Sequence, residues 1–202
     1  MFEVFTTVLV KNGEPQWLEQ HLERLKLHAR LAGLNPETSP PTPLHPVERG
    51  EKPYLMRISI NSNNWEIKTR EFIPPPSEAY TQGVSVYLSD QIATSQLKTN
   101  QRQVYDLAYE QARKNNAFEG LLLNQEGYLV DGSRSSLLLR QDNTLIILEG
   151  GIEGITRQQI CLRAKKLGFK IKRAYLKPSE LHGQLLIAGT GIGLVPVISY
   201  PS

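Results

Sequence analysis

The sequence predicts an α+β protein of two domains, with its strands in antiparallel sheets. Strand-like runs follow one another across short turns, without the regular helix–strand alternation of a doubly wound fold. Longer stretches between them have the spacing or composition of helices. A segment rich in proline and small polar residues lies between two structured parts of the chain. We therefore expect a small domain at 1–72, a linker at 73–82 and a larger domain at 83–202.

The first domain is expected to begin with a strand at residues 1–10, which ends in an Asn12-Gly13 turn. A helix follows, indicated by leucines at helical spacing. These are Leu18, Leu22, Leu25 and Leu31, with Gly33 near the end of the helix. Residues 35–53 are rich in proline and are predicted to be irregular. The runs at 54–60 and 65–73, separated by "NSNN", predict a hairpin.

The second domain is expected to open with a strand at 84–91 and a helix that starts near Asn100. Residues 118–148 predict a meander of short strands with turns at Glu126-Gly127 and Asp142-Asn143. The remaining predicted elements, in order, are a helix at 156–169, a strand at 170–176, a short helical piece at 177–183, and two strands around a glycine-rich turn at 184–200. No internal repeat is found.

Composition excludes several classes of protein. The 202 residues are 40% hydrophobic and 21% charged, as in ordinary globular proteins. No apolar run approaches the roughly 18 residues of a membrane-spanning helix, and the first residues do not resemble a signal peptide. The single cysteine, Cys161, excludes an internal disulfide framework. We expect a cytoplasmic protein with no membrane partner.

Nucleic acid is not an expected partner either. The net charge is only +3, and the one basic cluster, "LRAKKLGFKIKR", lacks the interleaved aromatic residues of a single-strand binder. A solvated face explains this cluster better.

Three further motifs fail on their context. "GTGIGL" is followed by Pro196 and β-branched residues, whereas a dinucleotide-binding loop must open a helix. "DGSRSSL" lacks the spacing of a nucleophile elbow. The four histidines and one cysteine have no metal-ligand spacing, so we expect no metal site.

What remains is a lysine and several segments suited to anions. Lys98 directly precedes a predicted helix, where the helix dipole disfavours a cation. "EGITRQQI" places Gly154, Ile155 and Thr156 at a helix start, with the threonine hydroxyl available as a cap. "AGTGIG" offers a second turn with Thr190. Each segment alone is also explained as a plain capped helix or hairpin turn, and Lys98, like Arg24 in "HLERL", as a solvated charge.

Taken together and in order, these segments resemble the class IV (fold type IV) aminotransferase family of pyridoxal-phosphate enzymes. The family includes branched-chain and D-amino acid aminotransferases and aminodeoxychorismate lyase. Five stretches carry the resemblance: "FEVFTTVLVKNGEPQWLEQHLERL", "LKTNQR", "EGYLVDGSRSSLLL", "GIEGITRQQI" and "AGTGIGLVPV". The "LKTNQR" stretch is closest to the Lys-x-x-Asn-Arg form of the lyase. The resemblance implies a two-domain fold like that of D-amino acid aminotransferase, with a shortened N-terminal domain.

The resemblance also implies a cofactor and roles for six residues. Lys98 would attach the aldehyde of pyridoxal 5′-phosphate and later move the substrate's proton. Asp131 falls where the family has an acid facing the pyridine nitrogen. The residues implied to hold the cofactor phosphate are Arg24, Ile155, Thr156 and Thr190.

The sequence departs from the family pattern at four of these positions or their neighbours. Asp131 stands where glutamate is usual, and Ser136 stands where asparagine is usual. Gln101 replaces the asparagine three residues after the lysine. Gln103 occupies the position of a tyrosine in branched-chain enzymes, which counts against that subgroup.

The resemblance therefore leads us to expect a homodimeric lyase that converts 4-amino-4-deoxychorismate to pyruvate and 4-aminobenzoate, a folate precursor. Two alternatives stay open. One is a pyridoxal-phosphate aminotransferase of the D-amino acid or branched-chain type, and the other is a non-catalytic member that keeps the fold.

Overall fold

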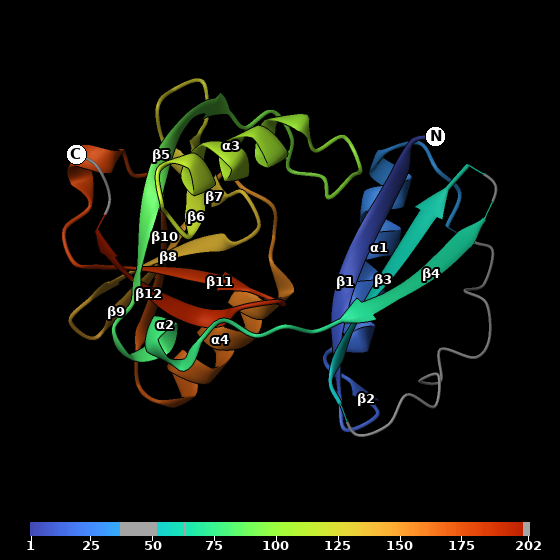
Figure 1. Ribbon diagram of the computed structural model, residues 1–202, viewed down its shortest axis with the longest axis horizontal. Coiled ribbons are helices and arrows are strands. Elements are labelled where there is room, and N and C mark those ends of the chain that lie inside the picture. The colour runs from blue at the N-terminus through green and yellow to red at the C-terminus, as the bar shows by residue number, and fades with distance from the viewer. Residues whose placement is uncertain (37–51, 63, 200–202) are drawn as a thin grey trace. The chain divides into compact units, whose positions relative to one another are not determined.

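The computed structural model describes residues 1–36, 52–62 and 64–199 (Figure 1). The chain divides into two compact units: one comprises 1–74 with Leu97–Gln101, and the other comprises 75–96 with 102–202. The sequence placed a linker at 73–82. In the structure Pro74 ends the first segment of the first unit, and residues 97–101 return to that unit.

In the first unit, a helix covers one face of a four-stranded sheet. The strands lie in the order β2-β1-β3-β4, and every pair between neighbours is antiparallel. The elements of this unit are β1 (Glu3–Lys11), β2 (Glu14–Pro15), α1 (Leu18–Leu31), β3 (Tyr54–Asn61) and β4 (Trp65–Glu71). The predicted 61–64 hairpin and Asn12-Gly13 turn are confirmed. Asn12 and Gly13 both have positive φ, as this turn requires. The proline-rich prediction lies mostly outside the described residues.

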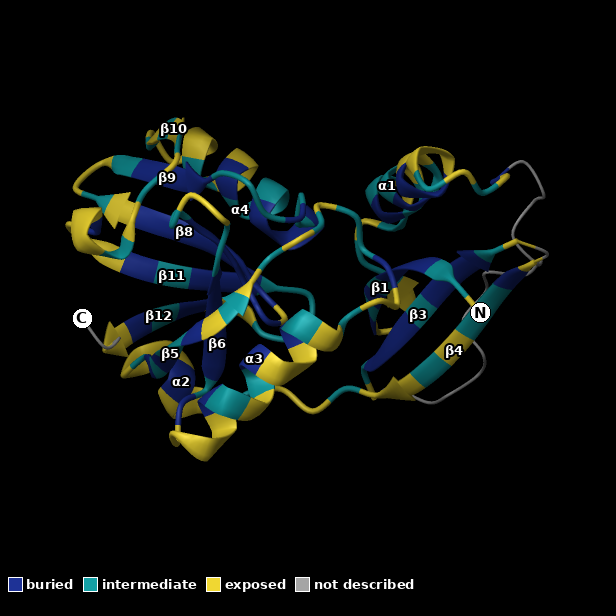
Figure 2. Ribbon diagram, turned by 90° about the horizontal axis from the view of Figure 1, so that it is seen from above, coloured by how far each residue is buried: buried dark blue, intermediate teal, exposed yellow. Residues whose placement is uncertain are grey.

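The core of the first unit is built by alternation. Residues of β1 two apart point to the same face of the sheet, and Val4, Val8 and Val10 pack there against Leu25 and Ala29 of α1. In Figure 2 the ribbon has the colour of buried residues along much of β1 and β3, and exposed residues lie on the outer side of α1. An amphipathic helix on a half-buried sheet is therefore the architecture of this unit.

The second unit is an eight-stranded sheet, counted over its described residues, with three helices. The strand order is β10-β9-β8-β11-β12-β5-β6-β7. Its strands are β5 (Val84–Ile92), β6 (Glu119–Leu123), β7 (Leu129–Gly132), β8 (Ser136–Gln141), β9 (Thr144–Leu148), β10 (Lys170–Ala174), β11 (Gln184–Gly189) and β12 (Gly193–Ser199). Its helices are α2 (Ser77–Thr81), α3 (Gln103–Lys114), α4 (Ile155–Lys166) and the short 3-10 turn η1 (Pro178–Glu180).

The α+β class is confirmed, but the expectation of purely antiparallel sheets is wrong for this unit. The pairs β5–β6, β9–β10 and β12–β5 are parallel. The first two pairs are joined through α3 and α4, and a parallel pair needs such a crossover. Each of these two helix crossovers is flanked by antiparallel hairpins, so the sequence shows no regular alternation of helices and strands.

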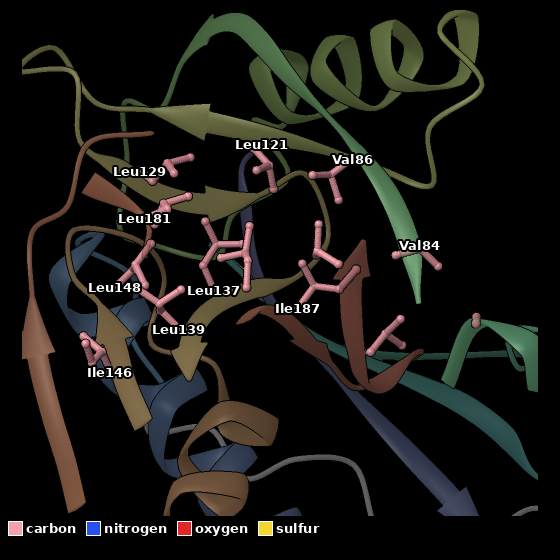
Figure 3. Close-up of a cluster of buried hydrophobic side chains, with 14 residues drawn as sticks. Val84, Val86, Leu121, Leu129, Leu137, Leu139, Ile146, Leu148, Leu181 and Ile187 are labelled. Carbon is pink, nitrogen blue, oxygen red and sulfur yellow. The ribbon is translucent and has the colours of Figure 1, made fainter. Parts of the chain in front are cut away.

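The apolar runs of β8 and β9 are explained by burial on both faces. Leu137 and Leu139 lie in one hydrophobic cluster, whereas Leu138 between them lies in another. Strands covered on both faces read as continuous apolar runs. Figure 3 shows Leu137, Leu139 and Leu148 pointing into the larger cluster.

Among the helices of the described residues, none is long and apolar enough to cross a membrane.

Candidate active site

The segment that carries Lys98 is fixed to the first unit by its backbone. The Phe5 N–H donates to the Lys98 carbonyl at 2.9 Å, and the Lys98 N–H donates to His28 Nδ1 at 3.0 Å. Thr99 forms a bridge with Val4. The lysine is half-buried, with its Nζ 4.9 Å from the centre of the Phe5 ring. Its backbone position therefore does not depend on its own side chain.

The helix predicted to start near Asn100 begins instead at Gln103, and Asn100 itself shows why. Its side-chain Oδ1 accepts from the Glu3 N–H at 3.1 Å, and its Nδ2 donates to the Met1 carbonyl at 2.8 Å. Its own N–H donates to the Glu3 carbonyl. Because the amide is engaged with the start of β1, it does not cap α3.

Arg24 and Lys98 concentrate positive charge in the first unit. Burial, together with these two cations, lowers the pKa of His21 to about 3 and that of His28 to about 4. Both imidazoles are therefore neutral near pH 7. Arg24 Nη2 donates to Thr6 Oγ1 at 2.8 Å. The Arg24 guanidinium near two neutral histidines favours an anion in this unit.

Asp131 lies in the second unit, buried in β7. Its Oδ2 accepts a hydrogen bond from the Ile152 N–H at 3.1 Å. Tyr105 of α3 is also buried, and its hydroxyl donates to the Ser95 carbonyl at 3.1 Å. Burial, and then the negative charge of Asp131, raises the pKa of Tyr105 above its ordinary range. Tyr105 is thus a neighbour of the predicted acid that the sequence did not single out.

The two shorter residues at 131 and 136 hold the same loop. Ser136 Oγ donates to the Ile152 carbonyl at 3.4 Å, while Asp131 accepts from the N–H of the same residue. The loop packs tightly there: a Cβ on Gly151 would lie 2.1 Å from the Val130 carbonyl oxygen, and a Cβ on Gly154 2.5 Å from Ser136 Oγ. Small residues on both sides therefore permit the close approach.

The start of α4 and the β11–β12 turn come together in the second unit. Gly154 is the N-cap of α4 and offers no side-chain cap, so the first N–H groups of the helix lack intrahelical acceptors. Thr156 Oγ1 lies 3.4 Å from Thr190 Oγ1. The Thr156 hydroxyl, considered as a helix cap from the sequence, makes this contact instead. Free N–H groups and two hydroxyls are suited to a phosphate.

Arg157 fixes the entry into α4. It is among the most buried side chains of the described residues, and its Nη1 donates to the Leu148 carbonyl at 3.1 Å. Its Nη2 pairs with Glu153 at 3.2 Å. The guanidinium thereby links the end of β9 to the loop that presents Ile155 and Thr156.

A buried acid supports the turn that follows Asp131. Glu119 of β6 accepts from the Ser133 hydroxyl and from the Arg134 N–H, and burial raises its pKa. Arg102 Nη2 donates to the Ser133 carbonyl at 2.7 Å. The signal available for Glu119 was a charged residue inside the apolar run "FEGLLL", and the predicted site does not include it.

The predicted site residues thus fall into two groups. Arg24 and Lys98 belong to the first unit, and Asp131, Ile155, Thr156 and Thr190 belong to the second. Within the second group, Thr156 and Thr190 are brought into contact. Over the described part of the chain, no cluster of histidine, cysteine and carboxylate side chains could hold a metal ion.

Comparison with known proteins identifies the family to which the chain belongs. A sequence model of the family described as amino-transferase class IV matches residues 3–200. The chain is a class IV aminotransferase family member. The fold type IV architecture is confirmed with it, and so is the assignment to a family of pyridoxal-phosphate enzymes.

Individual members of the class IV family resemble the chain to different degrees. A crystal structure provisionally named 4-amino-4-deoxychorismate lyase is 38% identical, with a TM-score of 0.86, and the match covers 98% of this chain and 85% of that one. A provisionally named branched-chain-amino-acid aminotransferase of Rickettsia bellii is 26% identical over 95% of this chain and 74% of its own. The T.th. branched-chain aminotransferase, solved with pyridoxamine 5′-phosphate, is 21% identical with a TM-score of 0.81, over 98% and 76% of the two chains.

Proposed function

We propose that the chain is a pyridoxal-phosphate lyase that converts 4-amino-4-deoxychorismate to 4-aminobenzoate and pyruvate. The observation that carries the proposal is the 38% identity to the provisionally named lyase over nearly the whole chain, against 26% for the Rickettsia aminotransferase. The Lys98–Arg102 spacing, and Gln103 in place of the branched-chain tyrosine, point in the same direction.

The residues present fit the cofactor's charge distribution. The first unit offers the Arg24 guanidinium, near two histidines that stay neutral because burial, with the charges of Arg24 and Lys98, lowers their pKa values. The second unit offers the uncapped start of α4 beside two threonine hydroxyls. Both features suit a phosphate dianion. When bound, pyridoxal phosphate supplies a protonated ring that withdraws electrons from the carbon that loses its proton.

Lys98 is the base in this proposal. Its backbone is held by Phe5 and His28, which fixes the point from which its side chain extends. A lysine in this role must be neutral for part of the time, because only the neutral amine accepts a proton. Lys98 Nζ would take the substrate proton, and elimination of the pyruvate-yielding side chain would follow.

Asp131 is proposed to keep the ring nitrogen protonated. The Ile152 N–H fixes one carboxylate oxygen, which sets the direction in which the group presents its charge. Aspartate is one methylene shorter than the usual glutamate. The Gly151–Gly154 loop packs closely against this shorter side chain and its neighbours.

An aminotransferase is the second candidate, favoured by the curated relatives. The provisionally named Rickettsia bellii aminotransferase and the Pseudomonas aeruginosa branched-chain aminotransferase, which is 27% identical over 59% of this chain, both point to it. An aminotransferase needs a keto acid as its second substrate, whereas the lyase needs none.

The test is an assay with and without a keto acid. We expect pyruvate and 4-aminobenzoate from aminodeoxychorismate with no keto acid added, and no product from Lys98→Ala. The opposite result would be a pyridoxamine form that accumulates with alanine or glutamate while aminodeoxychorismate is not consumed. That result would support the aminotransferase function and contradict the lyase function. A non-catalytic member would give neither product.

A further inference from the structure

One polar residue interrupts the apolar face of β1. Positions 4, 6, 8 and 10 point to the same side, and three of them are valines in the core against α1. Thr6 is the exception, and none of its surface is exposed. A hydroxyl buried in an apolar row needs hydrogen-bond partners.

The partners of Thr6 come from α1, and chemistry fixes the direction of the bond from Arg24. A guanidinium has no acceptor, so at 2.8 Å Arg24 Nη2 donates and Thr6 Oγ1 accepts. Thr6 Oγ1 also lies 2.7 Å from His21 Nδ1, so the imidazole holds the hydroxyl from a second side. The hydroxyl can donate to Nδ1 or accept from Nδ1–H, because its oxygen has two lone pairs, and in either case the bond fixes the position of Oγ1.

His21 is neutral under ordinary conditions. Burial and the charges of Arg24 and Lys98 lower its pKa to about 3, so it adds no positive charge near Arg24. Its Nε2 has no hydrogen-bond partner in the described part of the chain. A fully buried imidazole with one unsatisfied atom lowers the stability of the fold. Its contribution in this position is the hydrogen bond that holds Thr6.

We propose that Thr6 and His21 are positioning residues that orient the Arg24 guanidinium toward the cofactor phosphate. The inference rests on the proposed use of pyridoxal phosphate and adds a specific consequence. The bond from Thr6 fixes one edge of the guanidinium and so limits the directions in which its remaining N–H groups can donate. The chain Arg24–Thr6–His21 thus contributes to the preference for pyridoxal 5′-phosphate over unphosphorylated pyridoxal.

The experiment compares the affinities of the full chain for these two compounds. Protein freed of cofactor is titrated with each, and the ratio of the two dissociation constants is the readout. Thr6→Val should lower the preference for the phosphorylated compound about tenfold, as expected for one hydrogen bond to a charged group. Thr6→Ser, which keeps the hydroxyl, should stay within about twofold of the wild type. A general loss of packing would weaken both compounds alike and leave the ratio unchanged.

Thr69→Val is the matched control, because it makes the same change at a half-buried position of β4 in the same sheet. Its ratio should equal that of the wild type. If Thr6→Val does not fold, His21→Leu is measured in the same way and should also lower the ratio. A wild-type ratio in whichever of these two variants folds overturns the inference while leaving the proposed function intact. A wild-type protein that binds neither compound overturns the proposed function, and the inference with it.

Discussion

His28 connects the candidate catalytic lysine to α1. Its Nδ1 accepts the Lys98 N–H, and it is buried beside Arg24 and Lys98, which help to lower its pKa to about 4. An imidazole in this position works only while it is neutral, since a protonated Nδ1 cannot accept. The position of the Lys98 backbone is therefore linked to pH.

The first prediction concerns stability against pH. His21 and His28 titrate near pH 3 and 4 in the folded protein and near 6.5 when unfolded, so below pH 6.5 the unfolded chain binds more protons. The free energy of unfolding should be constant above about pH 6.5. As the pH is lowered further, it should decrease by up to about 1.4 kcal/mol per pH unit for each histidine. His28→Asn keeps an acceptor without a titrating ring. It should retain stability at pH 7 and show a shallower loss between pH 6.5 and 4.

Urea unfolding at several pH values measures this loss. His182→Asn, at an exposed position, is the control and should leave the slope unchanged. A His28→Asn variant whose slope equals that of the wild type would remove His28 from the explanation.

Sequence patterns found the residues that the family resemblance names, but not the residues that hold them. Lys98, Asp131 and Thr190 lie in recognisable motifs. Thr6, His21 and Glu119 act through contacts 14 to 18 residues away along the chain, and nothing in a local pattern records such a contact. A threonine in a valine row and a glutamate in a leucine row were the only local signals. Both read equally well as exposed strand positions.

At the scale of elements, the Gly150–Gly154 loop sets the geometry of the acid. Its Ile152 is bonded by both Asp131 and Ser136, and its glycines lie against the neighbouring strands. Asp131 and Ser136, the two departures from the family pattern in this region, therefore both bond to the same residue of the loop. We interpret them as a matched pair of short side chains under a closely packed loop.

The second prediction tests this packing with two glycine substitutions. Gly154→Ala should lower the free energy of unfolding by about 1–3 kcal/mol, because its Cβ meets Ser136 Oγ. Adding Ser136→Ala should recover part of that loss. The Cβ of Gly151→Ala would meet the backbone carbonyl of Val130 instead. Ser136→Ala should therefore not recover the stability lost in this variant. Thermal unfolding of the single and double variants measures the coupling, and strict additivity in both pairs would contradict the interpretation.

Most elements follow from local signals, whereas pairing does not. Turn residues placed the hairpins at Asn12-Gly13 and Asp142-Asn143, which the strand pairing confirms. The parallel pairs were missed because direction is set by the crossover helices and not by the strands themselves. The start of α3 was misplaced by three residues because Asn100 is engaged with β1.

At the scale of the whole molecule, we propose a homodimer, as the resemblance implies for the family. The third prediction is a mass of twice the single chain by light scattering at micromolar concentration. A monodisperse monomer that retains full activity would contradict it.

The most direct test of the account is the attachment of the cofactor to Lys98. Purified protein should be yellow, with an absorption band at the edge of the visible range that borohydride removes. Peptide mass spectrometry of the reduced protein should then find the reduced cofactor on Lys98 and on no other lysine. Lys98→Ala should lose the band while still binding the phosphate, because Arg24, Thr156 and Thr190 are intact. A colourless protein that does not respond to added pyridoxal phosphate, or an adduct on a different lysine, would contradict the account.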